Sequence, residues 1–250
     1  MNKYGIIVAM QEEMKEIEKL IKDMEIVKIF DLNFKKGKIN NSEVILAEAG
    51  VGKVNAARTT QILIDNFNID AIINLGSAAA ANDKLDIGDI VIARKLVQHD
   101  FDITAFGHPK GFISNVGQYL ECNKELIEKM KSVITKIQNK EFKILVGTIA
   151  SGDIFCTEIS MKDKIRYKFD ADAIEMEGAA IAQVCKLDNM PFIVIRGISD
   201  SPNGNNEITF EQYLEIASQR CAEIINVFIK DDGTFDTAYG VYQYTVDDFR

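Results

Sequence analysis

The stretch VIRGISDSPNG, Val194–Gly204, is the part of this chain from which the fold is most easily read. Its first part continues an apolar run that is typical of a buried β-strand, and the Pro-Asn-Gly sequence at its end is typical of a loop. An acid, Asp200, stands where the strand leaves the core. In open α/β sheets, ligands bind beyond the carboxyl ends of the strands. We therefore interpret this strand end as one edge of a candidate binding site.

Similar short apolar segments alternate with amphipathic segments along the whole chain, and this alternation predicts an α/β fold with helices on both faces of a sheet. Strands are predicted over Gly5–Ala9, Val44–Ala49, Ala71–Leu75, Asp89–Ala93, Ile144–Ile149, Ala173–Met176 and Phe192–Ile195. Helices, with apolar residues every three or four positions, are predicted over Gln11–Lys22, Lys53–Phe67, Lys124–Gln138, Glu177–Lys186 and Phe210–Phe228. The segment Ile29–Ile39 alternates like one arm of a hairpin.

The chain has no internal linker rich in Pro, Gly or Ser, so we expect one domain over residues 1–231. Residues 232–250 lose the helical period and become acidic and rich in tyrosine. An ordered extension, a disordered tail and an expression remnant all stay open for this segment.

Charge and composition set aside several classes of protein. The 250 residues carry a net charge of −9, which repels the phosphates of nucleic acids and anionic lipids. The apolar run near the N-terminus, Gly5–Met10, is too short for a signal peptide or a membrane span. We therefore expect a cytoplasmic protein with neither nucleic acid nor membrane as a partner.

The cysteines and histidines argue against a metal centre. Only two histidines are present, which disfavours a His-rich site. The four cysteines have spacings that fit neither a zinc motif nor a disulfide framework. We expect structural thiols at Cys122, Cys156, Cys185 and Cys221.

Acidic residues stand at several predicted strand ends. Glu13 lies in the first turn of the helix after the first strand, where acids are also common partners of the helix dipole. Glu175 and Glu177 follow a later strand, and Asp200 ends the last one. Buried carboxylates need partners, and Arg196 is the only evident cation beside them in the sequence. Several acids with few bases indicate a site for developing positive charge, as in cleavage of a glycosidic bond.

Eight motifs follow one another along the chain: GIIVAMQEE, GVGKVNAA, INLGSA, GDIV, HDFDITAFG, SGDIF, IEMEGAAIAQVC and PFIVIRGISD. In order and spacing they resemble those of the 5′-methylthioadenosine/S-adenosylhomocysteine nucleosidases, within the nucleoside phosphorylase superfamily. The resemblance covers about residues 3–230. It implies a three-layer α/β/α domain with a central mixed, partly barrelled β-sheet, which forms a homodimer. It also implies hydrolysis of the bond between adenine and ribose in thioether nucleosides, without a metal or cofactor.

The resemblance implies chemical roles for four residues. Asp200 would protonate adenine at N7, so that a neutral base leaves. Glu177 would accept hydrogen bonds from the ribose hydroxyls, and its charge would favour the cationic transition state. Glu13 would position and deprotonate the attacking water, with Arg196 orienting it.

The same resemblance implies a set of substrate contacts. Phe155 would stack on adenine, with backbone groups at Cys156 reading the edge of the base, and Phe106 would reach into the pocket of the neighbouring subunit. Contacts to the ribose, the water and the 5′-thioalkyl group are implied for Met176, Ser77, Ser199, Met10 and Phe210. The chain departs from the family at Ala79-Ala80, where Gly-Gly is usual, and alanine is costly there if the backbone needs a positive φ.

Other functions stay open on the sequence. In a phosphorylase of the same superfamily, phosphate attacks in place of water, but it would need cations where Glu12 and Glu13 stand. A nucleoside-binding protein without turnover would not need Glu13, Glu177 and Asp200 together. A related hydrolase could act on 5′-deoxyadenosine or on a futalosine-type compound.

Overall fold

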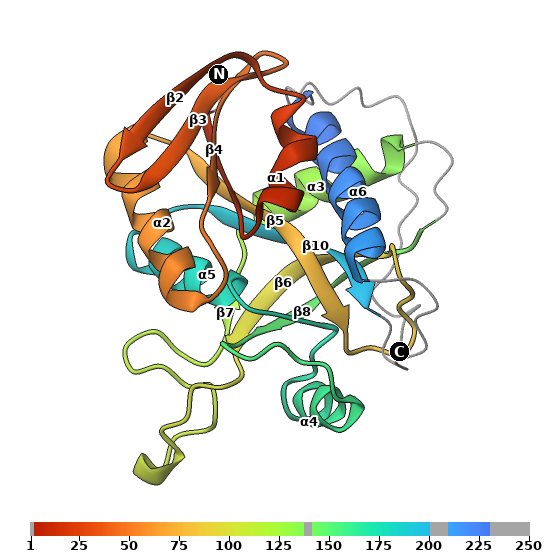
Figure 1. Cartoon of the computed structure of the whole chain (residues 1–250). Coiled ribbons are helices and arrows are strands. Elements are labelled where there is room, and N and C mark those ends of the chain that lie inside the picture. The colour runs from red at the N-terminus through yellow and green to blue at the C-terminus, as the bar shows by residue number, and fades with distance from the viewer. Residues whose placement is uncertain (1–2, 138–141, 201–209, 231–250) are drawn as a thin grey trace.

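One mixed β-sheet runs through the centre of the computed structural model, which describes residues 3–137, 142–200 and 210–230 (Figure 1). The strand order is β10-β6-β8-β9-β5-β1-β4-β3-β2, with β7 beside β6. A further pairing of β10 with β5 closes β5, β10, β6, β8 and β9 into a barrel, and the other strands extend the sheet from β5. The strands are β1 (Lys3–Val8), β2 (Lys22–Ile29), β3 (Leu32–Ile39), β4 (Ser42–Glu48), β5 (Ala71–Ala80), β6 (Ile90–Gln98), β7 (Leu120–Glu121), β8 (Ile144–Ser151), β9 (Ala173–Glu175) and β10 (Phe192–Asp200).

Strand directions in the barrel are mixed. β5 is parallel to β1 and β10 and antiparallel to β9. β8 is parallel to both β6 and β9. In this register Ala79 of β5 lies beside both Asp200 and Ile174, so the end of β10 and the end of β9 meet on either side of β5. The expected mixed, partly barrelled sheet is confirmed.

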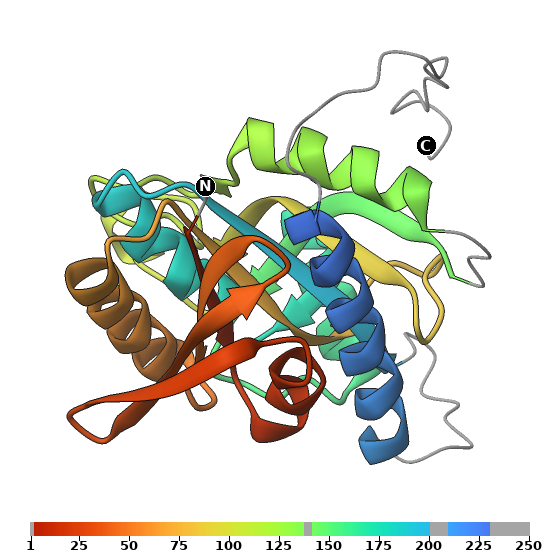
Figure 2. The same cartoon turned by 90° about the horizontal axis from the view of Figure 1, so that it is seen from above.

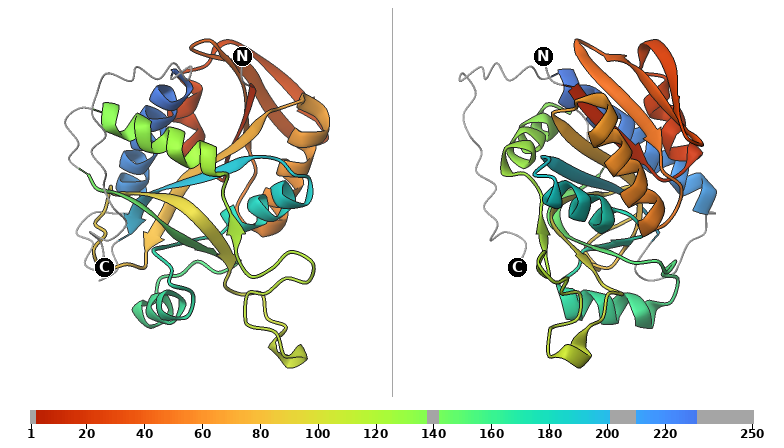
Figure 3. Two further views of the ribbon diagram at one scale, coloured as in Figure 1. Left: turned by 180° about the vertical axis from the view of Figure 1, so that it is seen from behind. Right: turned by 90° about the vertical axis from the view of Figure 1, so that its left-hand side faces the viewer.

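Helices cover both faces of the sheet, which confirms the three-layer α/β/α class (Figure 2). α2 packs with α5 on one face, whereas α1 and α3 pack beside α6 on the other. α4 and the short turn η1 lie at the lower end of the barrel in Figure 3, outside the two helical layers. The helices are α1 (Gln11–Glu18), α2 (Lys53–Phe67), α3 (Lys124–Lys136), α4 (Ile159–Phe169), α5 (Gly178–Leu187) and α6 (Phe210–Lys230), and η1 spans Thr104–Phe106. Among the helices described, none has the length and apolar composition of a membrane span.

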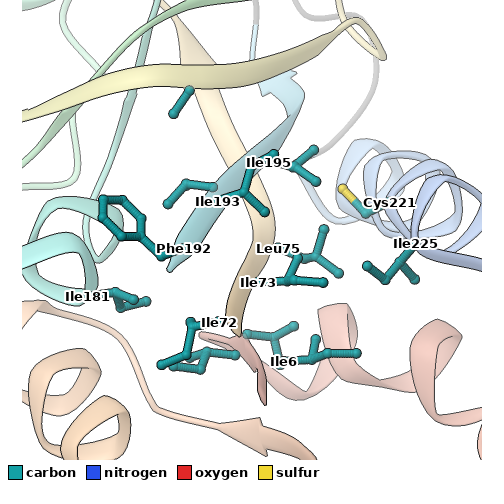
Figure 4. Packing of buried hydrophobic residues seen from close by; sticks show 14 of the residues in the cluster. Ile6, Ile72, Ile73, Leu75, Ile181, Phe192, Ile193, Ile195, Cys221 and Ile225 are labelled. Carbon is teal, nitrogen blue, oxygen red and sulfur yellow. The ribbon is translucent and has the colours of Figure 1, made fainter. Parts of the chain in front are cut away.

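The core is built around β10, which is buried from Phe192 to Ser199. Figure 4 shows Phe192 directed toward Ile181 of α5 and Leu75 of β5 directed toward Ile225 of α6. A strand that is covered on both faces by helices needs apolar residues at successive positions. This explains why the sequence of β10 is a continuous apolar run rather than an alternating one.

All four cysteines are buried and unbonded, as the sequence predicts. Burial raises the pKa of the Cys122 and Cys221 thiols to about 12. Neutral thiols of this kind behave as small apolar side chains, so these two cysteines serve packing. Cys156 differs from them because it also lines the pocket described below.

Several sequence predictions of secondary structure were wrong. The first helix ends at Glu18 rather than Lys22, and the chain continues as β2. Leu20 and Ile21 continue the helical spacing of apolar residues beyond the end of the helix. β2 is a largely exposed edge strand without an alternating apolar pattern. Periodicity alone therefore placed the end of the helix too late and did not indicate the strand. The helix α4 was not predicted, and β5 and β10 run several residues further than expected. The predicted tail over residues 232–250 lies outside the described residues.

Candidate active site

A pocket opens beside the ends of β5, β9 and β10 and the N-terminus of α1. Its volume is about 140 Å³, many times the space that one water molecule needs. Nine of the twelve site residues predicted from the sequence line it. The full lining is Ala9, Met10, Glu13, Val51, Ser77, Ala78, Ala79, Ile154, Phe155, Cys156, Ile174, Glu175, Met176, Glu177, Ser199 and Asp200.

The other three predicted residues lie elsewhere. Arg196 is fully buried behind the pocket wall. Phe106 lies on η1, and 81% of its side chain is exposed. Phe210 begins α6, but its side chain lies outside the described part of the chain.

Glu13 is held in the pocket by four hydrogen bonds. Its Oε1 accepts from the backbone N–H of Ser77 at 2.8 Å and from the Ser77 hydroxyl at 3.1 Å. Its Oε2 accepts from the backbone N–H groups of Ala9 at 3.0 Å and Met10 at 3.2 Å. A Cβ at Gly76 would lie 3.0 Å from Oε1, so the glycine allows this carboxylate to approach β5. Glu13 is thus both a helix-capping acid and a pocket residue.

Burial raises the pKa of Glu13, and the hydrogen bond from Ser77 and the charge of Arg196 only partly offset this effect. No cation lies in hydrogen-bond contact with Glu13 among the described residues; its partners are backbone amides and a hydroxyl. A carboxylate with a raised pKa is a better base near neutral pH. The site therefore provides a group that can accept a proton.

Glu175 and Glu177, which the sequence places two residues apart, point to different partners. Glu175 Oε2 accepts from the backbone N–H groups of Glu177 and Gly178 at 3.0 and 2.7 Å. Its Oε1 accepts a short hydrogen bond from the hydroxyl of Ser151, and its Oε2 also faces Arg196 Nη2 at 2.5 Å. Glu175 is therefore a fully partnered buried carboxylate that holds the start of α5.

Glu177 turns instead toward the start of α2, where its Oε1 accepts from the backbone N–H of Gly52 at 2.8 Å. Gly52 has a φ of 100°, a conformation that favours glycine. Burial and the neighbouring charge of Glu175 raise the pKa of Glu177 to about 7. No cation among the described residues contacts this carboxylate directly, and a buried carboxyl with a raised pKa in a pocket is suited to interact with a ligand.

Arg196 lies behind the pocket wall and contacts Glu175 and Asn74 there. Its Nη2 donates to Glu175 at 2.5 Å and to the Asn74 side-chain oxygen at 2.6 Å. The sequence-based prediction places Arg196 beside Glu13, but in the structure it acts on Glu13 only through its charge. Its position therefore fixes Glu175, and through the backbone of α5 it supports Glu177.

Asp200 has a cationic partner that the sequence analysis missed. Lys162 Nζ lies 2.6 Å from Asp200 Oδ2. The expectation that Arg196 is the only cation among these acids is therefore wrong. The sequence does contain a signal: Lys162, Ile165 and Phe169 are the buried residues of α4, so a lysine occupies a position where helical periodicity predicts an apolar residue.

A glycine turn at a helix N-terminus can bind an anion through its amides, but in the turn before α2 carboxylates of the protein already occupy two of these amides. Gly52 donates to Glu177, and the backbone N–H of Lys53 donates to Asp153 Oδ1 at 2.8 Å. The Lys53 ammonium lies 2.7 Å from Asp100 Oδ1. These contacts tie the start of α2 to the loop that carries Phe155.

The alanines that replace the usual glycines cause no backbone strain. Ala79 and Ala80 continue β5 and are not among the described residues with positive φ. Ala79 lines the pocket, whereas Ala80 is buried. The additional methyl group of Ala79 therefore narrows the pocket slightly and leaves its geometry intact.

Metal chemistry finds no support in the acids of the site. Over residues 3–137, 142–200 and 210–230, no group of three His, Cys, Asp or Glu side chains is arranged to hold a metal ion. The pocket acids point to amides, hydroxyls, Arg196 and Lys162 instead.

Comparison with known proteins relates this geometry to a family. Residues 3–230 match the family described as the phosphorylase superfamily. A 5′-methylthioadenosine/S-adenosylhomocysteine nucleosidase of Staphylococcus carnosus is 40% identical over 227 residues, which are 90% of this chain and 98% of that protein. A corresponding protein of Staphylococcus haemolyticus is 39% identical over 227 residues, with the same coverage.

Two solved structures are also similar. A futalosine hydrolase of Helicobacter pylori has a TM-score of 0.85 and 35% identity, covering 92% of this chain and 98% of that one. A 5′-methylthioadenosine/S-adenosylhomocysteine nucleosidase of Neisseria meningitidis, in complex with methylthio-immucillin-A, has a TM-score of 0.88 and 31% identity, covering 92% of this chain and 100% of that one.

The raised pKa of Glu177 predicts a pH-dependent cost to stability. The unfolded carboxyl titrates near 4.5 and the folded one at about 7, so the folded state loses stability as the pH rises through this window. In Glu177→Gln, the amide still accepts from Gly52 but cannot ionise. We expect the ligand-free variant to melt a few degrees higher than the wild type at pH 8, with no difference near pH 4.5. Thermal denaturation across this range measures the effect.

The matched control is Glu121→Gln, which makes the same change at an exposed site and should leave the pH dependence of melting unchanged. Equal melting temperatures for wild type and Glu177→Gln at every pH would contradict the prediction.

Proposed function

The chain belongs to the 5′-methylthioadenosine/S-adenosylhomocysteine nucleosidase family of the phosphorylase superfamily, and on that premise we propose that it hydrolyses the N-glycosidic bond of these two nucleosides. The products are adenine and the corresponding thioribose. The observation that carries the proposal is the convergence of Glu13, Glu177 and Asp200 on one pocket. Hydrolysis at a sugar carbon needs an acid for the leaving group and a carboxylate for the water. 5′-Deoxyadenosine, which shares adenine and ribose, is a further candidate substrate.

Asp200 acts as the general acid. As the bond between the ribosyl carbon and adenine N9 breaks, its electron pair moves into the base, and the proton of Asp200 is transferred to N7. Adenine then leaves as a neutral molecule. The position of Asp200 at the end of a strand buried on both sides supports this role, because the strand fixes the carboxyl at the pocket wall.

Glu13 acts on the attacking water. It accepts the proton of the water while the oxygen bonds to the ribosyl carbon, and its raised pKa supports this step. Ser77, which donates to Glu13 twice, orients the carboxylate. Arg196 supports the same group through its charge.

Glu177 binds the ribose hydroxyls, and its negative charge stabilises the positive charge that develops on the sugar. Met176 packs beneath the sugar and Ser199 contributes to the base end of the pocket. Phe155, which is 64% exposed, stacks on adenine, and the backbone at Cys156 reads the edge of the base. Met10, which lines the pocket, forms part of the wall of the 5′-thioalkyl site, a site to which the resemblance also assigns Phe210.

Water rather than phosphate is the nucleophile. Phosphate sites in proteins use helix N-termini, Arg and Lys. Here the amides of Ala9 and Met10, just before α1, donate to Glu13, and those of Gly52 and Lys53, at the start of α2, donate to Glu177 and Asp153. An incoming phosphate would meet carboxylates at both helix ends.

A second candidate substrate class is a futalosine-type nucleoside, because the similar Helicobacter pylori structure is named a futalosine hydrolase.

The protein acts as a homodimer in which Phe106 completes the pocket of the partner. Phe106 is 81% exposed on η1, which projects from the body of the protein in Figure 3. A large aromatic side chain at the tip of a projecting segment is better accounted for by burial against another chain than by exposure to water. We place the protein in the cytoplasm, where its four unbonded thiols would stay reduced.

Replacing the acid should remove turnover while leaving the fold intact. Asp200→Asn keeps an oxygen that can accept from Lys162 but has no proton to give to N7. We expect adenine release from methylthioadenosine to fall by about 10²- to 10⁴-fold, with substrate still bound in a calorimetric titration. Asp163→Asn makes the same change on the exposed side of α4 and should have wild-type activity. Near-normal adenine release by Asp200→Asn would refute the assignment of the acid.

The nucleophile can be identified from the sugar product. We expect free 5-methylthioribose from methylthioadenosine at the same rate with and without phosphate, since carboxylates occupy the helix ends that phosphate would use. Product analysis by mass spectrometry distinguishes the outcomes. Methylthioribose 1-phosphate formed only with phosphate would identify a phosphorylase, and absence of adenine from any nucleoside would favour a binding protein.

The variant Phe106→Ala, which removes the aromatic ring, should both weaken the dimer and raise the KM for methylthioadenosine. Phe30→Ala, at another highly exposed phenylalanine, is the control and should change neither. Sedimentation at micromolar concentration, in parallel with steady-state kinetics, measures both properties. A wild-type monomer with full activity would contradict the proposed dimer.

A further inference from the structure

The helix α4 contains a lysine at an inward position. The buried residues of this helix are Lys162, Ile165 and Phe169, which follow the i, i+3, i+7 spacing of a core-facing stripe. Lys164 and Lys168 on the same helix are exposed. Lys162 is therefore not one of the solvent-exposed lysines of α4. If this position served only to pack the helix, an apolar residue would be expected here.

The buried ammonium group lies at the proposed general acid. Lys162 is 2% exposed, and its Nζ lies 2.6 Å from Asp200 Oδ2, whose side chain is 24% exposed at the pocket. Burying a lysine costs several kcal/mol unless a hydrogen-bonded partner offsets the loss of hydration. A buried ammonium beside an acid at the edge of the pocket points to a role at that acid.

We propose that Lys162 is a positioning residue for Asp200: it fixes the orientation of the carboxyl and balances the charge that appears there when the proton passes to adenine. This inference rests on the proposed function. The proton moves from the Asp200 oxygen to N7, and the electron pair of the broken bond stays on adenine. Asp200 is then an anion, and an ammonium already in place stabilises it without reorganisation. Lys162 is thus not a catalytic residue itself, because it acts through Asp200.

Among the described residues, other charged groups near Asp200 come from several elements. The charges of Lys162, Asp200 and Glu158 all act on the Cys156 thiol, so these four groups form one neighbourhood. The remaining titratable groups that share the pocket with Asp200 are carboxylates, which repel an anion at that position. They are Glu13, Glu175 and Glu177.

The test uses two substrates that differ in their need for an acid. Methylthioadenosine requires protonation of its base, whereas 4-nitrophenyl 5-methylthioriboside releases a nitrophenolate that needs no proton. Lys162→Met keeps the length of the side chain and removes its charge. We expect it to lower kcat for methylthioadenosine by about tenfold or more while changing kcat for the nitrophenyl riboside much less. The ratio of the two rates does not depend on how much of the variant is folded.

Two further variants of α4 complete the comparison. Lys162→Arg keeps the cation and should restore the ratio of the two rates in part. Lys164→Met, the same change at an exposed position of α4, should match the wild type on both substrates.

The outcomes separate the two proposals. A Lys162→Met enzyme with equal losses on both substrates would overturn the role of Lys162 and leave the nucleosidase function standing. A wild-type protein that releases no adenine would overturn the proposed function instead.

Discussion

The buried ion pair between Arg196 and Glu175 is the interaction on which the site depends. Arg196 lies on β10 and Glu175 on β9, and the same network takes in Asn74 of β5 and Ser151 of β8. Four of the five barrel strands thus meet at one polar cluster inside an apolar core. A buried pair of this kind adds little net stability, because desolvation offsets the attraction between the charges. Its effect here is geometric, since it sets the position of α5 and with it the position of Glu177.

Sequence reasoning located the strand ends and their acids but not the connections between them. The buried strand β10 and its terminal Asp200 were predicted because a strand covered on both faces has a continuous apolar sequence. Which acid Arg196 would contact depends on the barrel register, and no local pattern contains that information. α4 was missed for a different reason: Lys162 interrupts its apolar stripe. The apolar pattern is thus broken at a residue that contacts the pocket, and departures from local rules are expected at such places.

The acids of the pocket have two kinds of partner, a cation or backbone amides, and this difference gives them different chemical properties. Asp200 faces an ammonium group, Lys162. Glu13 and Glu177 are bound mainly by backbone amides, and burial raises the pKa of both. Amides orient a carboxylate but neutralise less of its charge than a cation does. Glu13 and Glu177 can therefore respond to a proton or to a positive sugar, whereas the charge that develops on Asp200 has a fixed counter-ion.

The same amide contacts determine which nucleophile the site admits. The N-terminus of a helix attracts anions because its first N–H groups have no partner within the helix. Beside the start of α1 the amides of Ala9 and Met10 are bound to Glu13, and at the start of α2 the amides of Gly52 and Lys53 are bound to Glu177 and Asp153. Each carboxylate adds a negative charge at a helix start, where it repels phosphate. A neutral water molecule is not repelled, and Glu13 offers it an acceptor for its proton. One set of side chains thus closes the helix ends to an anion and prepares the site for hydrolysis.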